Sequence, residues 1–93
     1  MVVGVLTAQI GIDSASSLKD KRQVVKSLLA RLRSSFNISA AEIDDHDIWR
    51  SAVLGIAVVA TDAAFANAVL DKVVDHIESD PRVNLGHCEI EMQ

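Results

Sequence analysis

An uncharged aliphatic run from Ala52 to Ala60 constrains the fold of this chain more than any other feature. A membrane-spanning helix needs roughly 20 apolar residues, so this run is too short to cross a bilayer. Its β-branched and small side chains are typical of a strand that is covered on both faces. We therefore expect residues 51–61 to form a central strand of a sheet.

Helical segments and further strand-like segments flank this run. Residues 18–34 carry apolar side chains on one helical face, and Ser17 with Asp20 three residues later resembles a capping box. Residues 63–79 form a second helical segment, which Pro81 ends. Val, Leu, Thr and Ile with small residues between them predict a strand at residues 2–12, and alternation of apolar and polar residues predicts two more, at 36–43 and 83–92.

The elements follow the order βαββαβ. Two interlocked strand-helix-strand units in this order give the split βαβ, or ferredoxin-like, fold of the α+β class. This fold predicts a four-stranded antiparallel sheet ordered 4-1-3-2, with two helices on one face, and residues 1–93 as a single domain. The alternation of the last strand changes phase at Gly86, which indicates a β-bulge.

The sheet face away from the helices is expected to be apolar with polar margins. Strands one and three are apolar on both sides, whereas strands two and four are polar on one side. Such a strip commonly contacts another chain, so a homodimer is expected, with Val53, Ala57 and Trp49 at its interface. The alternative is a monomer that tolerates the strip because most of its side chains are small.

Composition narrows the class of protein. The chain has 9 Lys and Arg against 13 Asp and Glu, with a net charge of −4, and 49% of its residues are hydrophobic, which argues against a disordered chain. Its single cysteine, Cys88, excludes an intramolecular disulfide. Together with the lack of a membrane-length apolar segment, these features predict a cytoplasmic protein that does not bind membranes.

The positive charge is concentrated on the first predicted helix. Residues 16–35 contain six Lys and Arg and one Asp, a net charge of +5, whereas the remainder carries −9. Cations beside the free N–H groups of a helix start suit a phosphate or carboxylate. The candidate anion-binding residues are Ser17, Lys19, Lys21, Arg22 and Lys26. The alternative is a solvated face that balances acidic residues of the second helix.

Other clusters of reactive side chains carry weaker signals. The stretch from Asp44 to Asp47 offers carboxylates and an imidazole, but neighbouring loop residues rarely converge on an ion, and a polar connection is the favoured interpretation. His87 and Cys88 are adjacent in a predicted strand and should point to opposite faces. No metal site, cofactor or catalytic residue is therefore expected.

Three stretches resemble the YlxP-like proteins, small bacterial proteins of unassigned function. The stretches are SLKDKRQVVKSLLARLRSSFNISAAEI at residues 17–43, DIWRSAVLGIAVVATD at 47–62 and DPRV at 80–83. The resemblance implies a ferredoxin-like fold. It also implies a role near ribosome maturation, because such genes often lie among those for translation factors. Asp20, Ala40 and Ala41 depart mildly from the family pattern.

The sequence therefore leads to two function hypotheses of different classes. The first is a non-enzymatic binding protein that presents the basic helix to structured RNA or a ribosomal subunit, where contacts to phosphates give affinity and salt dependence. The alternative is a dimeric protein-interaction or small-ligand regulatory module that uses the aliphatic sheet face. An enzyme is the third and weakest hypothesis.

Overall fold

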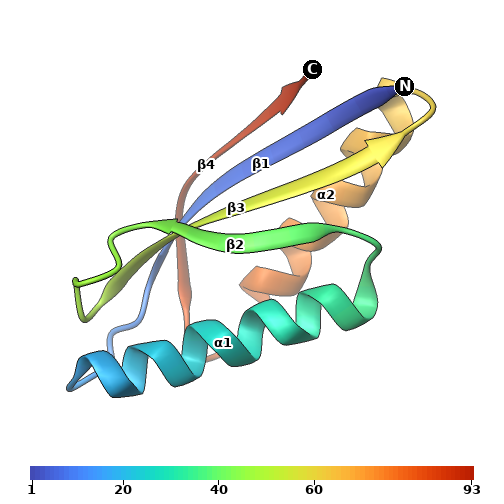
Figure 1. Cartoon of the computed structure of the whole chain (residues 1–93). Helices are drawn as coiled ribbons and strands as arrows, with labels where there is room; N and C mark the ends of the chain where they lie inside the picture. Colours follow the sequence, from blue (N-terminus) through green and yellow to red (C-terminus); the bar gives the residue numbers. More distant parts are fainter.

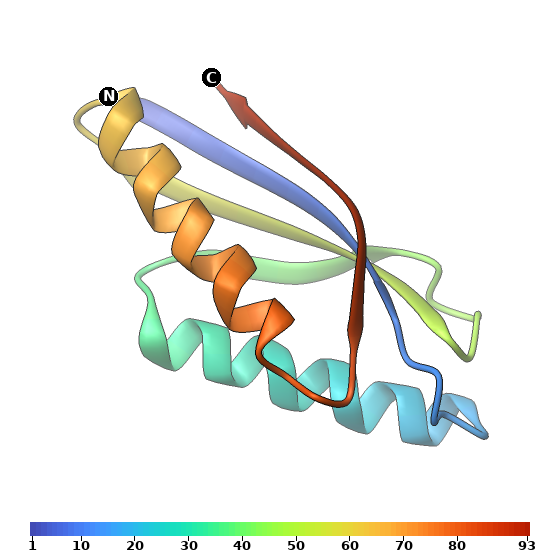
Figure 2. The same cartoon turned by 180° about the vertical axis from the view of Figure 1, so that it is seen from behind.

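The computed structural model describes residues 1–93 and consists of one four-stranded sheet and two helices. The elements in chain order are β1 (Val2–Gly11), α1 (Leu18–Ser35), β2 (Ser39–Asp44), β3 (Ser51–Ala60), α2 (Ala63–Glu78) and β4 (Asn84–Met92). The strands are antiparallel and ordered β2-β3-β1-β4, and both helices cover the same face (Figures 1 and 2). The predicted ferredoxin-like topology is confirmed.

The central strands pair along their full length, from Val2 opposite Ala60 to Gly11 opposite Ser51. The pairing of β4 with β1 is interrupted. Leu85 lies opposite Ile10 and Cys88 opposite Ala8, so two residues of β4 oppose the single residue between them in β1. This interruption is the β-bulge predicted at Gly86.

The second strand begins later than the sequence pattern predicts. It starts at Ser39 rather than Phe36, because Phe36 is the C-terminal cap of α1 and its carbonyl accepts a hydrogen bond from the Ile38 N–H at 3.0 Å. Phe36 and Ile38 nevertheless pack against the core. Their apolar pattern therefore resembles that of a strand although they form the connection to it.

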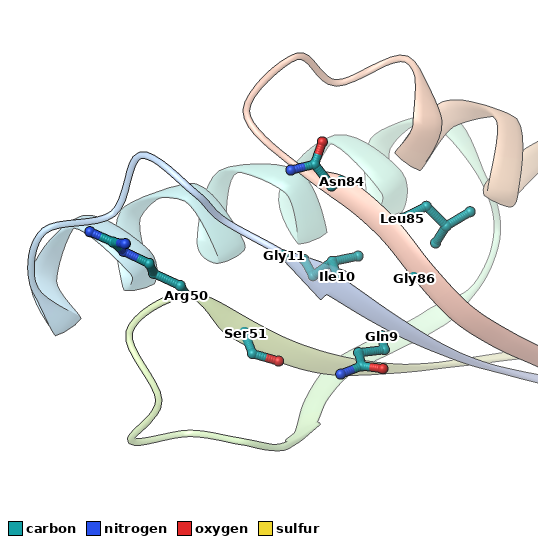
Figure 3. Close-up of a pocket in the computed structure, with 8 residues that line it drawn as sticks. All are labelled: Gln9, Ile10, Gly11, Arg50, Ser51, Asn84, Leu85 and Gly86. Carbon is teal, nitrogen blue, oxygen red and sulfur yellow. The ribbon is translucent and has the colours of Figure 1, made fainter.

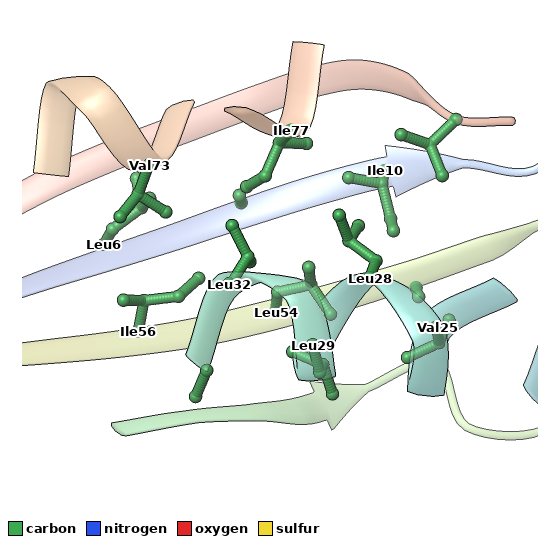
Figure 4. Packing of buried hydrophobic residues seen from close by; sticks show 14 of the residues in the cluster. Leu6, Ile10, Val25, Leu28, Leu29, Leu32, Leu54, Ile56, Val73 and Ile77 are labelled. Atoms are coloured by element: carbon green, nitrogen blue, oxygen red, sulfur yellow. The ribbon is translucent and has the colours of Figure 1, made fainter. Parts of the chain in front are cut away.

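The hydrophobic core lies between the sheet and the two helices. It includes Leu6, Ile10, Leu54 and Ile56 from the sheet, and Leu28, Leu32, Val73 and Ile77 from the helices (Figure 4). Burying one such side chain contributes about 1.5–3 kcal/mol. Gly4 permits close packing of α2, because a Cβ there would lie 3.0 Å from Leu70 Cδ1. Neither helix has the length and apolarity that crossing a membrane requires.

Candidate functional site

The start of α1 is capped by the protein's own side chains. The Ser17 hydroxyl accepts a hydrogen bond from the Asp20 N–H at 3.1 Å, and the Asp20 carboxylate accepts bonds from the N–H and hydroxyl of Ser16 at 3.1 and 2.7 Å. The bonds from Ser16 hold the pKa of Asp20 below its usual value. Asp20 thus occupies the positive end of the helix, and Ser17 acts as its cap. Contact of the Ser17 hydroxyl with phosphate stays a prediction.

Lys21 is buried, so its predicted contact with phosphate is wrong. Its side chain has no exposed surface, and Nζ lies 3.0 Å from Oε2 of Glu42. Nζ also donates hydrogen bonds to the backbone carbonyls of Asp45 and of His46, the latter at 3.3 Å. Lys21 therefore fastens the first turns of α1 to the loop between β2 and β3.

Helical spacing explains why Lys21 turns inward. It precedes Val25 by four residues and Leu28 by seven, and both of these are buried in the core. Residues at these intervals share one helix face. Lys21 therefore occupies a core position, and this spacing is the sequence signal that distinguishes it from the neighbouring cations.

Four other cations of α1 form a line on the helix surface, which we call the basic stripe. Lys19, Arg22, Lys26 and Arg33 are exposed. Their spacing of three, four and seven residues keeps them on one side of the helix. Arg22, Lys26 and Arg33 also line a shallow groove of about 310 Å³ between α1 and β2, together with Val25, Leu29 and Glu42. The basic stripe therefore faces the β2 edge of the molecule.

Arg33 also belongs to the stripe, although it is not among the predicted anion-binding residues. Its guanidinium donates a hydrogen bond to the backbone carbonyl of Ala40 in β2, at 2.6 Å. This contact holds Arg33 against the edge of the sheet. The signal that identifies it is its position seven residues after Lys26, two full helical turns away.

The remaining cation of α1, Arg31, lies outside the stripe. Its Nη1 atom is 3.5 Å from Oδ2 of Asp80. The Asp80 carboxylate also accepts hydrogen bonds from the backbone N–H and the guanidinium of Arg82, at 2.7–3.0 Å. The Arg82 side chain is the main cause that holds the pKa of Asp80 below its usual value. Arg31 thus links α1 to the connection between α2 and β4.

The acidic loop between β2 and β3 uses its side chains locally. Asp44 accepts a hydrogen bond from the Asp45 N–H at 2.8 Å, and Asp45 accepts one from the Ser51 hydroxyl at 3.0 Å. No three His, Cys, Asp or Glu side chains gather in the structure as metal ligands would. Trp49 is half-exposed on this loop, and its predicted role at an interface stays a prediction.

A second concavity, of about 370 Å³, lies at the bulged end of the sheet (Figure 3). Its polar side chains hold loops together: Arg50 Nε donates to the Ala15 carbonyl at 3.1 Å, and Asn84 Nδ2 donates to Asp13 Oδ2 at 2.6 Å. The labelled side chains spread outward from several strands and do not converge on one point. This concavity therefore does not have the form of a ligand site.

Two solved structures share the architecture of this chain. The solution NMR structure of the de novo designed protein LFR1 1 with ferredoxin fold matches with a TM-score of 0.57 and 16% identity, covering 98% of this chain and 85% of that one. The de novo designed protein Foldit4 matches with a TM-score of 0.54 and 11% identity, over 100% and 97% of the two chains. At these identities the similarity shows the fold alone.

The family follows from the sequence comparisons. The chain belongs to the family described as Protein of unknown function (DUF503), whose model matches residues 3–90. It is 34% identical over 82 residues to Uncharacterized protein YlxP of Bacillus subtilis (strain 168). The aligned residues cover 88% of this chain and 89% of that relative. The resemblance to the YlxP-like proteins is confirmed.

Proposed function

We propose that this protein is a non-enzymatic binding protein that contacts the phosphates of structured RNA through the basic stripe of α1. The observation that carries the proposal is that Lys19, Arg22 and Lys26 are exposed on one side of the helix and take part in none of the protein's ion pairs. Unpaired cations in a line are suited to a polyanion, because binding releases the counterions condensed on it.

The dimensions of the stripe support contact with several phosphates. Lys19 and Arg33 are fourteen residues apart, so at 1.5 Å per residue the stripe is about 21 Å long. Its cations lie on one rigid helix rather than on mobile loops. Three phosphate contacts predict a slope of about −3 in a plot of log K against log salt concentration.

The chemistry of the stripe favours structured RNA over a single strand. Proteins that bind single strands stack bases on aromatic side chains. Residues 18–35 contain no Phe, Tyr or Trp, and the central strands of the sheet contain none either. Recognition would then depend on the shape and phosphates of a folded RNA, with little sequence preference.

Ribosomal RNA is the structured RNA that we propose. The support for it is the resemblance to YlxP-like proteins, whose genes often lie among those for translation factors. The net charge of −4 does not oppose this proposal, because a polarised charge distribution steers an anionic partner by its local field. A cytoplasmic location is part of the same proposal.

Co-sedimentation with small ribosomal subunits across a salt series tests the proposal. We expect the unmodified protein to sediment with the subunits at low salt and the double variant Lys19→Glu with Arg22→Glu to stay in the supernatant. Lys26→Glu and Lys72→Glu change the net charge equally, but Lys72 lies on α2. Lys26→Glu should weaken binding and Lys72→Glu should not. Absence of binding at low salt, or equal binding of the double variant, would contradict the proposal.

A protein-interaction or small-ligand module that uses the sheet face is the second candidate function. It is favoured by Val59, which is 64% exposed on the side of the sheet away from the helices. Under this alternative the charge reversals on α1 leave partner binding intact. The same variants therefore separate the two functions.

A further inference from the structure

We call the side of the sheet away from the helices the open face. Along β1, β3 and the part of β2 from Ser39 to Ile43, this face carries no charged side chain. Its residues are Val3, Val5, Thr7, Gln9, Ser39, Ala41, Ile43, Ser51, Val53, Gly55, Ala57 and Val59. Ile43 lies over Gly55, because a Cβ added there would be 3.0 Å from Ile43 Cγ2. The predicted aliphatic strip is therefore present.

The open face exposes apolar side chains to the solvent. Val59 is 64% and Ile43 52% exposed. A hollow of about 320 Å³ lies among Asn37, Ile38, Ser39, Ala57 and Val59. Because each Å² of apolar surface removed from water contributes about 25 cal/mol, covering this face is favourable.

We propose that a second copy of this chain covers the open face, with the two sheets packed face to face about a twofold axis. β1 and β3 have ten residues each, β4 has nine and β2 has six. At about 3.3 Å per residue and about 4.8 Å of width per strand, the face measures roughly 550 Å² per copy. Two copies then bury roughly 1,100 Å², which exceeds the roughly 1,000 Å² expected of a specific interface.

The register of the sheet selects the direction of the axis. Ser39, Ala57, Val5 and Glu91 form one row across the four strands, and Ala41, Gly55, Thr7 and Glu89 form another. Glu89 and Glu91 lie on the open face, because the intervening residue Ile90 packs against the core. The β4 margin of each copy therefore carries Glu89 and Glu91, with His87 2.9 Å from Glu89. The β2 margin carries Ser39, Ala41 and Ile43, and its only carboxylate is Asp44, opposite Val53 at the end of the strand.

An axis parallel to the strands, between β1 and β3, keeps like charges apart. It places β1 over the partner's β3 and the acidic β4 margin over the partner's β2 margin, with the position of Ser39 facing that of Glu91. An axis perpendicular to the strands would instead place the two β4 margins over each other, which like charges disfavour. The parallel axis is thus part of the proposal.

This dimer leaves the basic stripe free. The helices lie on the opposite side of the sheet from the open face (Figure 2). The two copies of α1 therefore lie on the outer surfaces of the dimer. Dimerisation and RNA binding use different faces, so either one can fail in experiment without the other.

Sedimentation equilibrium of the purified protein without RNA tests the dimer. We expect twice the chain mass of 10.0 kDa at micromolar concentrations, and a dissociation constant raised about 30-fold or more by Val59→Asp. Phe65→Asp is the matched control, since Phe65 is 59% exposed but lies in the first turn of α2, where a helix accepts Asp. Circular dichroism checks that both variants fold.

A second variant tests the axis by gain of affinity. Ser39→Lys places a cation opposite the partner's Glu91 only if the axis is parallel to the strands, and should tighten the dimer by about 3-fold. A monomeric unmodified protein at several hundred micromolar, or a folded Val59→Asp variant that dimerises as tightly as the unmodified protein, overturns the dimer. Unchanged or weaker association of Ser39→Lys overturns the axis.

Discussion

Lys21 and Asp80 are the buried charged residues of this protein, and they are held in different ways. Asp80 is bound mainly by Arg82, two residues away in the chain. The partners of Lys21 lie 21 to 25 residues away, in β2 and the loop after it. One site is therefore local in the sequence, and the other exists only when α1 packs against β2.

The two sites also differ in how water can reach their partners. Arg82 is 36% and Arg31 51% exposed, so both guanidinium groups remain hydrated beside Asp80. Glu42 is only 15% exposed beside Lys21, and its Oε2 accepts no hydrogen bond, so the contact is ionic. Breaking a pair is most costly when the remaining charge stays buried. Loss of Lys21 should therefore cost more than loss of Asp80.

The largest expected effect comes from Lys21→Met. This change keeps an unbranched apolar stem but removes the terminal ammonium, which leaves Glu42 without its cation and two carbonyls without their donor. We expect the free energy of unfolding to fall by about 3 kcal/mol, measured by urea denaturation. The fluorescence of the single tryptophan, Trp49, should also change, because Lys21 holds its loop.

The double variant Lys21→Met with Glu42→Leu is the control for that change. It removes both charges, so no buried carboxylate remains unpaired, and stability should recover by about half or more. A double variant that is less stable than Lys21→Met alone would show that the ion pair is not the cause of the first loss.

A smaller effect is expected from Asp80→Asn. Asparagine can still accept a bond from the Arg82 backbone N–H, but it has no charge to hold the two guanidinium groups. The expected loss is about 1–2 kcal/mol at neutral pH, measured by the same urea titration. A loss as large as that of Lys21→Met would contradict the contrast between the two sites.

The pH dependence of Asp80 sharpens the comparison. Its pKa is lowered in the folded protein, chiefly by the Arg82 side chain. A lowered pKa contributes stability above the ordinary value of about 4, and that contribution is lost as the pH falls through the folded pKa. The difference in unfolding free energy between the unmodified protein and Asp80→Asn should therefore be constant from pH 5 to 7 and shrink below pH 4. A constant difference down to pH 2 would contradict this account.

The smallest effect is expected from Arg31→Gln. The contact with Asp80 measures 3.5 Å and Arg31 is half-exposed, while Arg82 continues to neutralise the carboxylate. We expect a loss of about 0.5 kcal/mol, within the range of surface ion pairs, from thermal or urea unfolding. A loss above about 1.5 kcal/mol would mean that Arg31 contributes to the fold through more than this contact.

The same distinction separates what sequence patterns predicted from what they missed. The element order, the central strands, the cap at Ser17 and the bulge at Gly86 depend on neighbouring residues, and all four predictions are confirmed. The predicted start of β2 at Phe36 is wrong, because Phe36 and Ile38 are apolar residues that pack against the core without pairing in the sheet. Local alternation does not distinguish packing from pairing.

The candidate site was predicted only in part. Lys19, Arg22 and Lys26 are exposed as expected, because their helical positions face away from the core. The charge of Lys21 predicts an exposed position, but its helical spacing places it beside the buried residues Val25 and Leu28. Arg33 is not among the predicted residues, although its position seven residues after Lys26 places it on the same side of the helix. Its contact with Ala40, which joins α1 to β2, appears only in the tertiary structure.

The sequence by itself determined the class of fold, since hydrophobic periodicity and turn residues are properties of short segments. It also determined that α1 is basic. Only the tertiary structure decided which of those cations face the solvent, because a buried ammonium is stable only where oxygen atoms from β2 and its loop surround it. Packing turned one cation into a structural contact and left four others in a line along the β2 edge.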